Sequence, residues 1–311
     1  MTGAGSPPTD PGWSAWQPLA LRVPPATAVL AETLDGGQAF RWRSHNGVWH
    51  GQFGGSVVRL LLDADGDLRW SAPAALAVST GPALAHYFDT ARDPQELADS
   101  LPWRSDPHLA ACIAAFPGLR ILRQPFGETL LGFLCSATKQ IVQIKQMLAL
   151  LAERHGAPLL ADLSPSAFRL SPLPCRLPTW AELALIPEAE LRACQFGFRA
   201  RFIHQTACFL AAHPGWLETT EMLPYTAAKE RLCSLPGVGE KIADCVLLFG
   251  AGRLEAFPVD TWILKTMAAR YGLHGWKPAQ VAQFGRAHFG PLAGLAQQYL
   301  FSWERKHGDK R

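Results

Sequence analysis

A glycine-rich turn between two helix-forming stretches constrains the fold of this chain more than any other feature. Residues 225–234 favour a helix, and Pro236 and Gly237 end it, because proline lacks an amide hydrogen and glycine tolerates left-handed backbone angles. Residues 239–249 then favour a second helix, with apolar residues spaced by four and three along one face. Free amides and the positive end of that helix both favour a bound phosphate.

Two helices joined by Leu-Pro-Gly-Val-Gly have the pattern of the helix-hairpin-helix motif, which holds the DNA backbone without reading its sequence. Gly237, Val238 and Gly239 are therefore the candidate backbone contacts. We expect double-stranded DNA to be the binding partner.

Two residues near this turn could carry chemistry. Lys241 lies in the first turn of the second helix, and Asp260 follows nineteen residues later. A lysine amine can attack a carbon electrophile and form a Schiff base, and a carboxylate can stabilise a developing positive charge. The residues alone leave commoner roles open, since a surface lysine pairs with phosphate and an aspartate often caps a helix.

Six segments, in the same order along the chain, resemble the 8-oxoguanine DNA glycosylase/AP lyase family of the helix-hairpin-helix glycosylase superfamily. They are residues 34–42, 119–125, 134–136, 196–202, 235–245 and 294–302. The resemblance extends over roughly residues 20–305. It implies that a damaged purine is flipped out of the duplex, that Lys241 attacks the sugar, and that Asp260 stabilises the oxocarbenium-like state. The Schiff base would then permit β-elimination of the 3′ phosphate.

The resemblance also implies a base-binding set. Gly37 would detect the extra N7–H of 8-oxoguanine through its backbone carbonyl, and Gln297 would read the Watson–Crick edge. Cys245 and Phe301 would sandwich the base, and Pro258 belongs to the same set. The plainer alternatives are a turn glycine at 37 and ordinary core packing for the cysteine and the phenylalanine.

Further positions face the duplex in the family. Phe198 would wedge beside the opposite base, and Arg199 would contact the backbone or that base. Thr138 and Gln143 depart from the family pattern, which has an asparagine run and then an arginine. Glutamine lacks the charge and the two-pronged donor of arginine, so we expect a weaker preference for cytosine opposite the lesion.

Composition sets broad limits. The chain has 311 residues, 48% of them hydrophobic and 18% charged, which is typical of a globular protein. A net charge of +3 permits a nucleic-acid partner without requiring one. The seven cysteines are dispersed, so no C-x-x-C spacing for zinc or an iron–sulfur cluster exists. We expect no cofactor and no metal at the catalytic residues, while a monovalent cation on the hairpin carbonyls is compatible with the motif.

The same features bear on the cellular setting. Dispersed cysteines, odd in number, indicate free thiols in a reducing compartment, and no apolar run is long enough to cross a membrane. We expect a monomer in the bacterial cytoplasm, associated with the nucleoid.

The pattern along the chain predicts an α+β fold. Residues 20–75 carry strand signals, including an Asn46-Gly47 hairpin turn, and residues from about 82 onward are helical, with the longest helix at 127–153. We expect a flexible N-terminus (1–16), an antiparallel-sheet domain (17–110) and a helical domain (111–311), whose last helix could pack back on the sheet domain.

Two alternatives remain at this stage. One is a glycosylase of the same fold that prefers alkylated purines; Gly37 and Gln297 favour an oxidised purine instead. The other is a non-catalytic helix-hairpin-helix DNA-binding module, which would need neither Lys241 nor Asp260.

Overall fold

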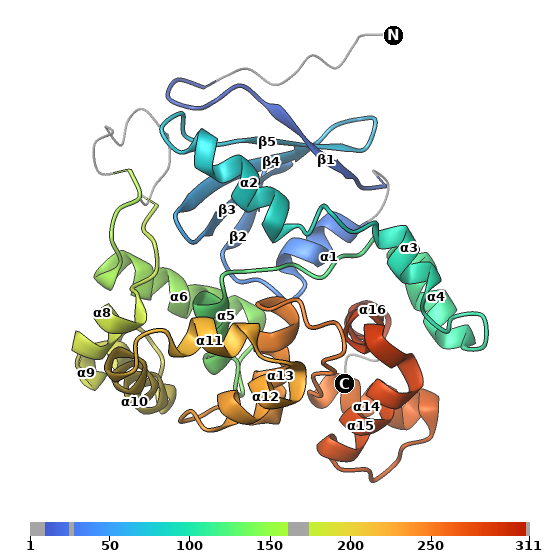
Figure 1. Ribbon diagram of the computed structural model, residues 1–311. Helices are drawn as coiled ribbons and strands as arrows, with labels where there is room; N and C mark the ends of the chain where they lie inside the picture. Colours follow the sequence, from blue (N-terminus) through green and yellow to red (C-terminus); the bar gives the residue numbers. More distant parts are fainter. Residues whose placement is uncertain (1–9, 25–27, 161–173, 309–311) are drawn as a thin grey trace.

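The computed structural model describes residues 10–24, 28–160 and 174–308. An antiparallel sheet lies against a larger body of helices (Figure 1). The strands are β1 (Gln17–Arg22), β2 (Trp42–His45), β3 (Val48–Phe53), β4 (Ser56–Leu62) and β5 (Asp67–Ser71), and their order across the sheet is β1-β5-β4-β3-β2. The α+β prediction is confirmed.

Short turns connect the four consecutive strands β2 to β5. Asn46 and Gly47 have φ angles of 49° and 77°, as a two-residue hairpin requires, and this turn was predicted. Between β4 and β5, the Asp63 carboxylate accepts hydrogen bonds from the amides of Asp65 and Asp67. The acidic stretch there is a turn stabilised by its own side chain.

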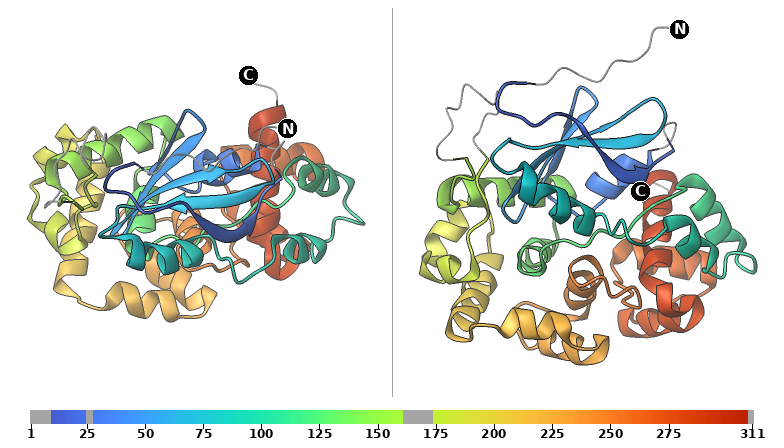
Figure 2. Two further views of the ribbon diagram at one scale, coloured as in Figure 1. Left: turned by 90° about the horizontal axis from the view of Figure 1, so that it is seen from above. Right: turned by 45° about the horizontal axis from the view of Figure 1, so that its top comes forward.

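The helices follow the sheet in sequence. They are α1 (Val29–Asp35), α2 (Ala77–Tyr87), α3 (Pro94–Asp99), α4 (Pro107–Ala115), α5 (Phe126–Leu134), α6 (Ile141–His155), α8 (Trp180–Leu185), α9 (Glu188–Ala193), α10 (Arg199–Ala212), α11 (Trp216–Met222), α12 (Tyr225–Cys233), α13 (Glu240–Phe249), α14 (Thr261–Tyr271), α15 (Pro278–Phe289) and α16 (Ala293–His307). Seen from above, α8 to α10 lie on one side of the sheet and α14 to α16 on the other (Figure 2).

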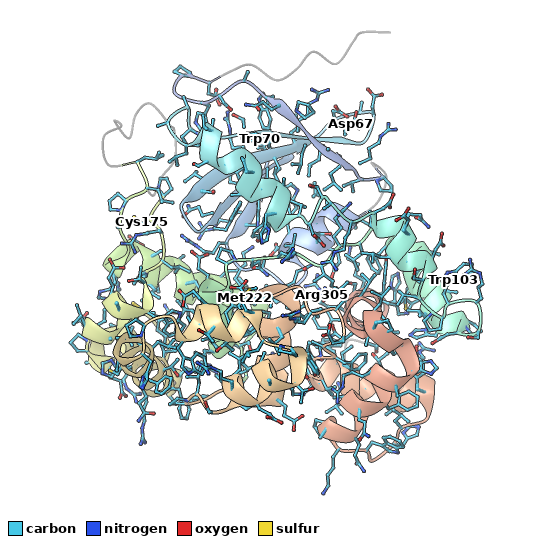
Figure 3. The ribbon with its side chains drawn as sticks, viewed as in Figure 1. Asp67, Trp70, Trp103, Cys175, Met222 and Arg305 are labelled. Atoms are coloured by element: carbon cyan, nitrogen blue, oxygen red, sulfur yellow. The ribbon has the colours of Figure 1, made fainter. Side chains whose placement is uncertain are left out.

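Helix α2 covers one face of the sheet. Trp70 of β5 lies beneath it (Figure 3), and a Cβ atom on Gly81 would come within 3.1 Å of the Trp70 ring. The glycine therefore lets the helix lie directly on the indole.

Residues 10–16 correct one expectation. They were assigned to a flexible N-terminus, but Trp13 is buried and the Arg59 guanidinium lies 3.9 Å from the centre of its ring. Arg59 also pairs with Asp10. A cation held between an aromatic ring and a carboxylate fixes this segment on the sheet. Residues 1–9 of the expected flexible segment lie outside the described residues.

The helix predicted at 127–153 is broken in two. Helix α5 ends at Leu134 and α6 starts at Ile141, so residues 135–140 form a loop. The Ser136 hydroxyl donates to the carbonyl of Phe133, and Thr138 has a φ of 52°. Side-chain bonds to the backbone compete with helical bonds, which explains why an apolar pattern that continues in helical register is interrupted here.

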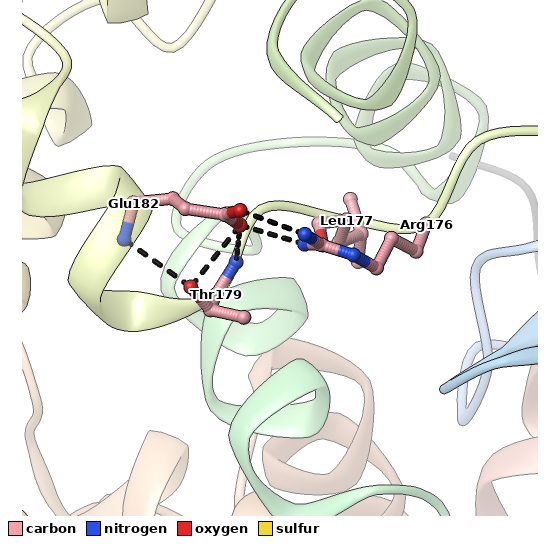
Figure 4. Close-up of polar contacts among 4 residues, drawn as sticks. All are labelled: Arg176, Leu177, Thr179 and Glu182. Carbon is pink, nitrogen blue, oxygen red and sulfur yellow. Dashed lines mark hydrogen bonds and ion pairs between the residues drawn. The ribbon is translucent and has the colours of Figure 1, made fainter. Parts of the chain in front are cut away.

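Side-chain hydrogen bonds fix the N-terminus of helix α8. Thr179 and Glu182 form a capping box in which each side chain accepts from the other's amide, and Arg176 donates two hydrogen bonds, of 2.6 and 2.7 Å, to the Glu182 carboxylate (Figure 4). These two hydrogen bonds join Arg176, which precedes α8, to the first turn of that helix.

One hydrophobic core runs through the sheet and the helices. It includes Trp42 and Leu60 from the sheet, Leu130 of α5, Val246 of α13 and Leu300 of α16. Helix α16 also reaches the N-terminal part, because Arg305 donates a 2.8 Å hydrogen bond to the buried Glu32 carboxylate of α1. The boundary proposed at residue 110 stays a prediction.

Candidate active site

The hairpin between α12 and α13 is braced by α10. Gly237 has a φ of 78°, and a Cβ atom there would lie 2.8 Å from the Cβ of Phe202, so only glycine fits both constraints. Thr206 of α10 donates a 3.1 Å hydrogen bond to the Pro236 carbonyl. The turn is therefore held in place by α10.

The three predicted phosphate contacts differ in their surroundings. A Cβ atom on Gly239 would meet nothing within 4 Å, and this residue begins α13, where the first amides have no helical partner. Val238 is buried, and its amide donates to the Leu235 carbonyl. Gly237 and Gly239 are thus exposed whereas Val238 is buried, and the role of each in DNA binding stays a prediction.

A buried carboxylate that the sequence analysis missed ties α12 to α13. Asp244 is 1% exposed and accepts hydrogen bonds from the Tyr225 hydroxyl (2.6 Å) and the Lys229 ammonium (3.0 Å). Burial raises the pKa of Asp244, and the nearby Lys229 opposes this rise. Asp244 lies three residues after Lys241, so the pair of bonds fixes the helix that carries the candidate nucleophile.

Lys241 faces the end of α5. Its Nζ donates a 3.0 Å hydrogen bond to the Oγ of Ser136 and lies 5.5 Å from the centre of the Phe133 ring. Ser136 was not singled out from the sequence, because 105 residues separate it from Lys241 and neither local pattern points to the other.

Asp260 caps α14 and lies within electrostatic range of Lys241. One carboxylate oxygen accepts a 2.8 Å hydrogen bond from the Ile263 amide. Burial raises the pKa of Asp260, while the bond from Ile263 and the charge of Lys241 oppose the rise. Capping and charge stabilisation were set as alternatives, and this geometry accommodates both.

Cys245 lies next to this pair. It is buried, and burial raises the pKa of its thiol to about 12, while the charges of Lys241 and Asp260 act on it in opposite directions. The structure thus brings Lys241, Cys245 and Asp260 into one electrostatic group. Pro258, two residues before the aspartate, is buried as well.

A second group contains Gly37 and Phe301. Gly37 has a φ of 106°, and a Cβ atom there would lie 3.1 Å from Cδ1 of Ile141 and 3.5 Å from Cε1 of Phe301. Gly37 and Phe301 thus lie side by side, and Ile141 is a neighbour that the sequence analysis did not name. The contact of the Gly37 carbonyl with a base stays a prediction.

Gln297 connects the two groups along α16. Gly294, Gln297 and Phe301 are spaced by three and four residues and so share one face of the helix. Gly294 packs on Leu248 of α13, whereas Phe301 reaches Gly37. Gln297 is 5% exposed, and its side-chain oxygen has no hydrogen-bond partner among the described residues. A buried acceptor of this kind is expected where a ligand supplies the donor.

The four positions expected to face the duplex divide into two pairs. Phe198 is 53% exposed and Thr138 is exposed, as an outward role requires. Arg199 is only 3% exposed; it donates to the Ala137 carbonyl and, at 2.8 Å, to the Thr138 hydroxyl. Gln143 accepts from the Gln140 amide at the start of α6. Arg199 and Gln143 therefore hold the 135–140 loop rather than point into solvent.

No group of three or more histidine, cysteine, aspartate or glutamate side chains suited to a metal gathers within residues 10–24, 28–160 and 174–308. A monovalent cation on the hairpin carbonyls stays a prediction. In the same ranges, no helix is both long enough and apolar enough to cross a bilayer.

Comparison with known proteins places the site in a family. Residues 20–130 match the model of the 8-oxoguanine DNA glycosylase N-terminal domain. The chain is 30% identical over 307 residues to the N-glycosylase/DNA lyase OGG1 of Arabidopsis thaliana, covering 93% of this chain and 80% of that protein. The chain belongs to the 8-oxoguanine DNA glycosylase family.

Solved structures of this glycosylase family match the fold closely. The 8-oxoguanine glycosylase/lyase of Clostridium acetobutylicum, in complex with double-stranded DNA containing cytosine opposite 8-oxoG, superposes with a TM-score of 0.80 at 31% identity, over 90% of this chain and 92% of that chain. A 3-methyladenine DNA glycosylase from Archaeoglobus fulgidus superposes with a TM-score of 0.71 at 18% identity, over 94% of this chain and 99% of that chain, which shows a shared fold alone.

Proposed function

We propose that this glycosylase excises 8-oxoguanine from duplex DNA through a Schiff base on Lys241 and then cleaves the strand by β-elimination. The observation that carries the proposal is that Lys241, in the first turn of α13 directly after the hairpin, lies within electrostatic range of Asp260 at the start of α14. An amine, a carboxylate and an anion-binding turn are the parts that chemistry at a nucleotide sugar requires.

The reaction can be followed through its bonds. The neutral Lys241 amine attacks C1′ of the flipped nucleotide, and the electrons of the C1′–N9 bond leave with the base, which takes up a proton. The Asp260 carboxylate stabilises the positive charge that develops on the sugar. The attached nitrogen then loses one proton, its lone pair forms a protonated imine at C1′, and the C1′–O4′ bond breaks with O4′ taking up a proton. Removal of a C2′ proton pushes electrons towards this imine, breaks the C3′–O bond and releases the 3′ phosphate.

Two acceptors support 8-oxoguanine as the lesion. An N7–H distinguishes 8-oxoguanine from guanine, and in this proposal it donates to the backbone carbonyl of Gly37, which lies next to the Phe301 ring. The unpartnered oxygen of Gln297 is buried and available to a second N–H of the flipped base. A site built to pair with a donor discriminates strongly against an analogue that lacks it.

In this proposal, the base opposite the lesion is recognised less strictly. Gln143 carries no charge and uses its side-chain oxygen to accept from the Gln140 amide, and the Arg199 guanidinium bonds the 135–140 loop, so neither position offers a free guanidinium to the opposite base. We therefore infer a broader tolerance for the base opposite the lesion than an arginine at position 143 would give.

The test is borohydride trapping with duplexes that carry 8-oxoguanine opposite each of the four bases. The wild-type protein should give a covalent adduct, and Lys241→Gln should give none while still binding duplex. Lys265→Gln removes an exposed lysine of α14 and serves as the matched control. Absence of an adduct with every wild-type duplex would contradict the proposal, and excision assays on alkylated purines would then decide between the two lesion classes.

We also propose that the protein acts as a monomer on the chromosome in a bacterial cytoplasm, without a cofactor. The seven cysteines are unpaired, which suits a reducing compartment. Light scattering at micromolar concentration should give a mass near 33.9 kDa, and a mass of twice that value would exclude the monomer.

A further inference from the structure

The hydrogen bond between Lys241 and Ser136 has a defined direction. The Ser136 hydroxyl also lies 2.7 Å from the Phe133 carbonyl, which can only accept a hydrogen bond. The single hydroxyl proton therefore points to Phe133, and the free lone pairs of the serine oxygen face Lys241. The amine is the donor in this pair, so the serine fixes where its nitrogen lies.

Ser136 belongs to the 135–140 loop, which Arg199 of α10 fixes by hydrogen bonds. Ala137, the next residue, offers its carbonyl to the buried Arg199, and the same guanidinium bonds the Thr138 hydroxyl. Thr138 is β-branched and has a φ of 52°, a strained conformation that persists only where its surroundings hold it. The Arg199 bonds are the contacts that impose it.

These contacts form a continuous chain from the exposed face to the amine. The Arg199 guanidinium lies 4.4 Å from the centre of the exposed Phe198 ring. The same guanidinium donates hydrogen bonds to Ala137 and Thr138. The adjacent Ser136 accepts the hydrogen bond from Lys241. If Arg199 moves, it shifts the backbone of Ala137, and the single peptide bond between Ala137 and Ser136 passes this shift to the serine.

We propose that Ser136 is a positioning residue for the Lys241 amine, and that Arg199 sets its position through the Ala137–Thr138 backbone. The inference rests on the proposed function, since it concerns how the nucleophile of that reaction is placed. Contact between DNA and the exposed Phe198 and Thr138 then governs the placement of the nucleophile as well as binding.

The first experiment compares Ser136→Ala with Ser136→Thr under single-turnover conditions with saturating enzyme. Removing the acceptor should lower the excision rate about tenfold, equivalent to about 1.4 kcal/mol, because the amine loses the hydrogen bond that orients it. The duplex Kd should stay within about twofold, and threonine, which keeps the hydroxyl, should restore most of the rate. The control is Ser79→Ala, because Ser79 makes the same bond to a carbonyl three residues earlier, on α2.

A double-mutant cycle tests the Arg199 step. Arg199→Lys keeps the charge but replaces the planar guanidinium, which bonds Phe196, Ala137 and Thr138 through two nitrogens, with a single flexible ammonium. It should therefore slow excision in the wild-type background. In the Ser136→Ala background the same change should have little further effect, because the connection to Lys241 is already lost. Thr138→Val removes one of the two partners without touching the buried arginine and should behave in the same way if Arg199→Lys proves unstable.

The outcomes separate the two proposals. If wild-type protein gives no borohydride adduct, the proposed function fails. If it gives an adduct and Ser136→Ala excises at the wild-type rate, only the positioning role of Ser136 fails. If Arg199→Lys and Ser136→Ala multiply in their effects on rate, the Arg199 connection is wrong.

Discussion

A Cβ atom on Gly37 would lie 3.5 Å from Cε1 of Phe301, although 264 residues separate the two positions in the chain. Helix α16 brings them together, and the 2.8 Å hydrogen bond from its Arg305 to Glu32 holds that helix against α1. The candidate base site therefore depends on contacts between the N-terminal part of the chain and its last described helix.

Gly37→Ala should slow lesion excision while leaving the protein folded. The φ of 106° is strained for any residue with a Cβ atom, and the added methyl would meet Ile141 at 3.1 Å. We expect at least a tenfold loss in single-turnover rate, equivalent to about 1.4 kcal/mol. Gly47→Ala is the matched control, because Gly47 also has a positive φ, of 77°, but a Cβ atom there would meet nothing within 4 Å. Equal activity of the two variants would contradict the role of Gly37.

Gln297→Met should stabilise the free protein and impair catalysis. An unpaired buried polar atom costs about 1–3 kcal/mol, which the thioether removes at nearly the same volume. Gln298→Met is the control, because the Gln298 amide nitrogen is equally buried without a partner among the described residues, yet Gln298 lies on another face of α16. Urea unfolding should show a similar gain for both, whereas excision should fall only for Gln297→Met. Unchanged excision would remove Gln297 from the base site.

Thr138→Asn should raise stability by about 0.5–1 kcal/mol, since asparagine tolerates a positive φ far better than a β-branched residue does. Thr138→Ser separates the strain caused by the β-branch from the hydrogen bond to Arg199, because serine keeps the hydroxyl that Arg199 contacts but lacks the branch. Urea unfolding should rank asparagine above serine and serine above threonine. A less stable Thr138→Asn variant would show that the loop is not strained at this residue.

Excision should decline at mildly acidic pH because of Asp260. Burial raises the pKa of this carboxyl, and the ionised form is the one that stabilises a cationic sugar. Activity is therefore lost as the pH falls through the folded-state pKa, which lies above the usual aspartate range. Asp260→Asn should slow excision by orders of magnitude and remove this acid limb from the pH–rate profile.

The same shift predicts an effect on stability. A carboxyl with a raised folded-state pKa contributes stability only when protonated, and loses that contribution as the pH rises through the folded-state value. Asparagine keeps the cap on α14 and removes the buried charge. Asp260→Asn should therefore be more stable than wild type at neutral pH, by an amount that shrinks on acidification. A constant difference across pH would contradict the raised pKa.

The sequence predicted those parts of the site that lie close together in the chain. Lys241, Cys245 and the hairpin share one segment, whose glycines and helix spacing leave few alternatives. The inward orientation of Arg199 and the Ser136 bond could not be predicted, because both depend on partners that are 61 to 105 residues distant. The break in the helix at 127–153 has a local cause in Ser136 and Thr138, but the apolar periodicity continues across it.

The position of Phe301 on α16 also has a consequence for biosynthesis. During translation, the hairpin, Lys241 and Asp260 leave the ribosome well before Gln297 and Phe301. A nascent or truncated chain that ends after residue 260 would contain the hairpin and Lys241 but would lack Phe301, the aromatic neighbour of Gly37. The ability to select a damaged base therefore requires α16, which is translated after the hairpin and the nucleophile.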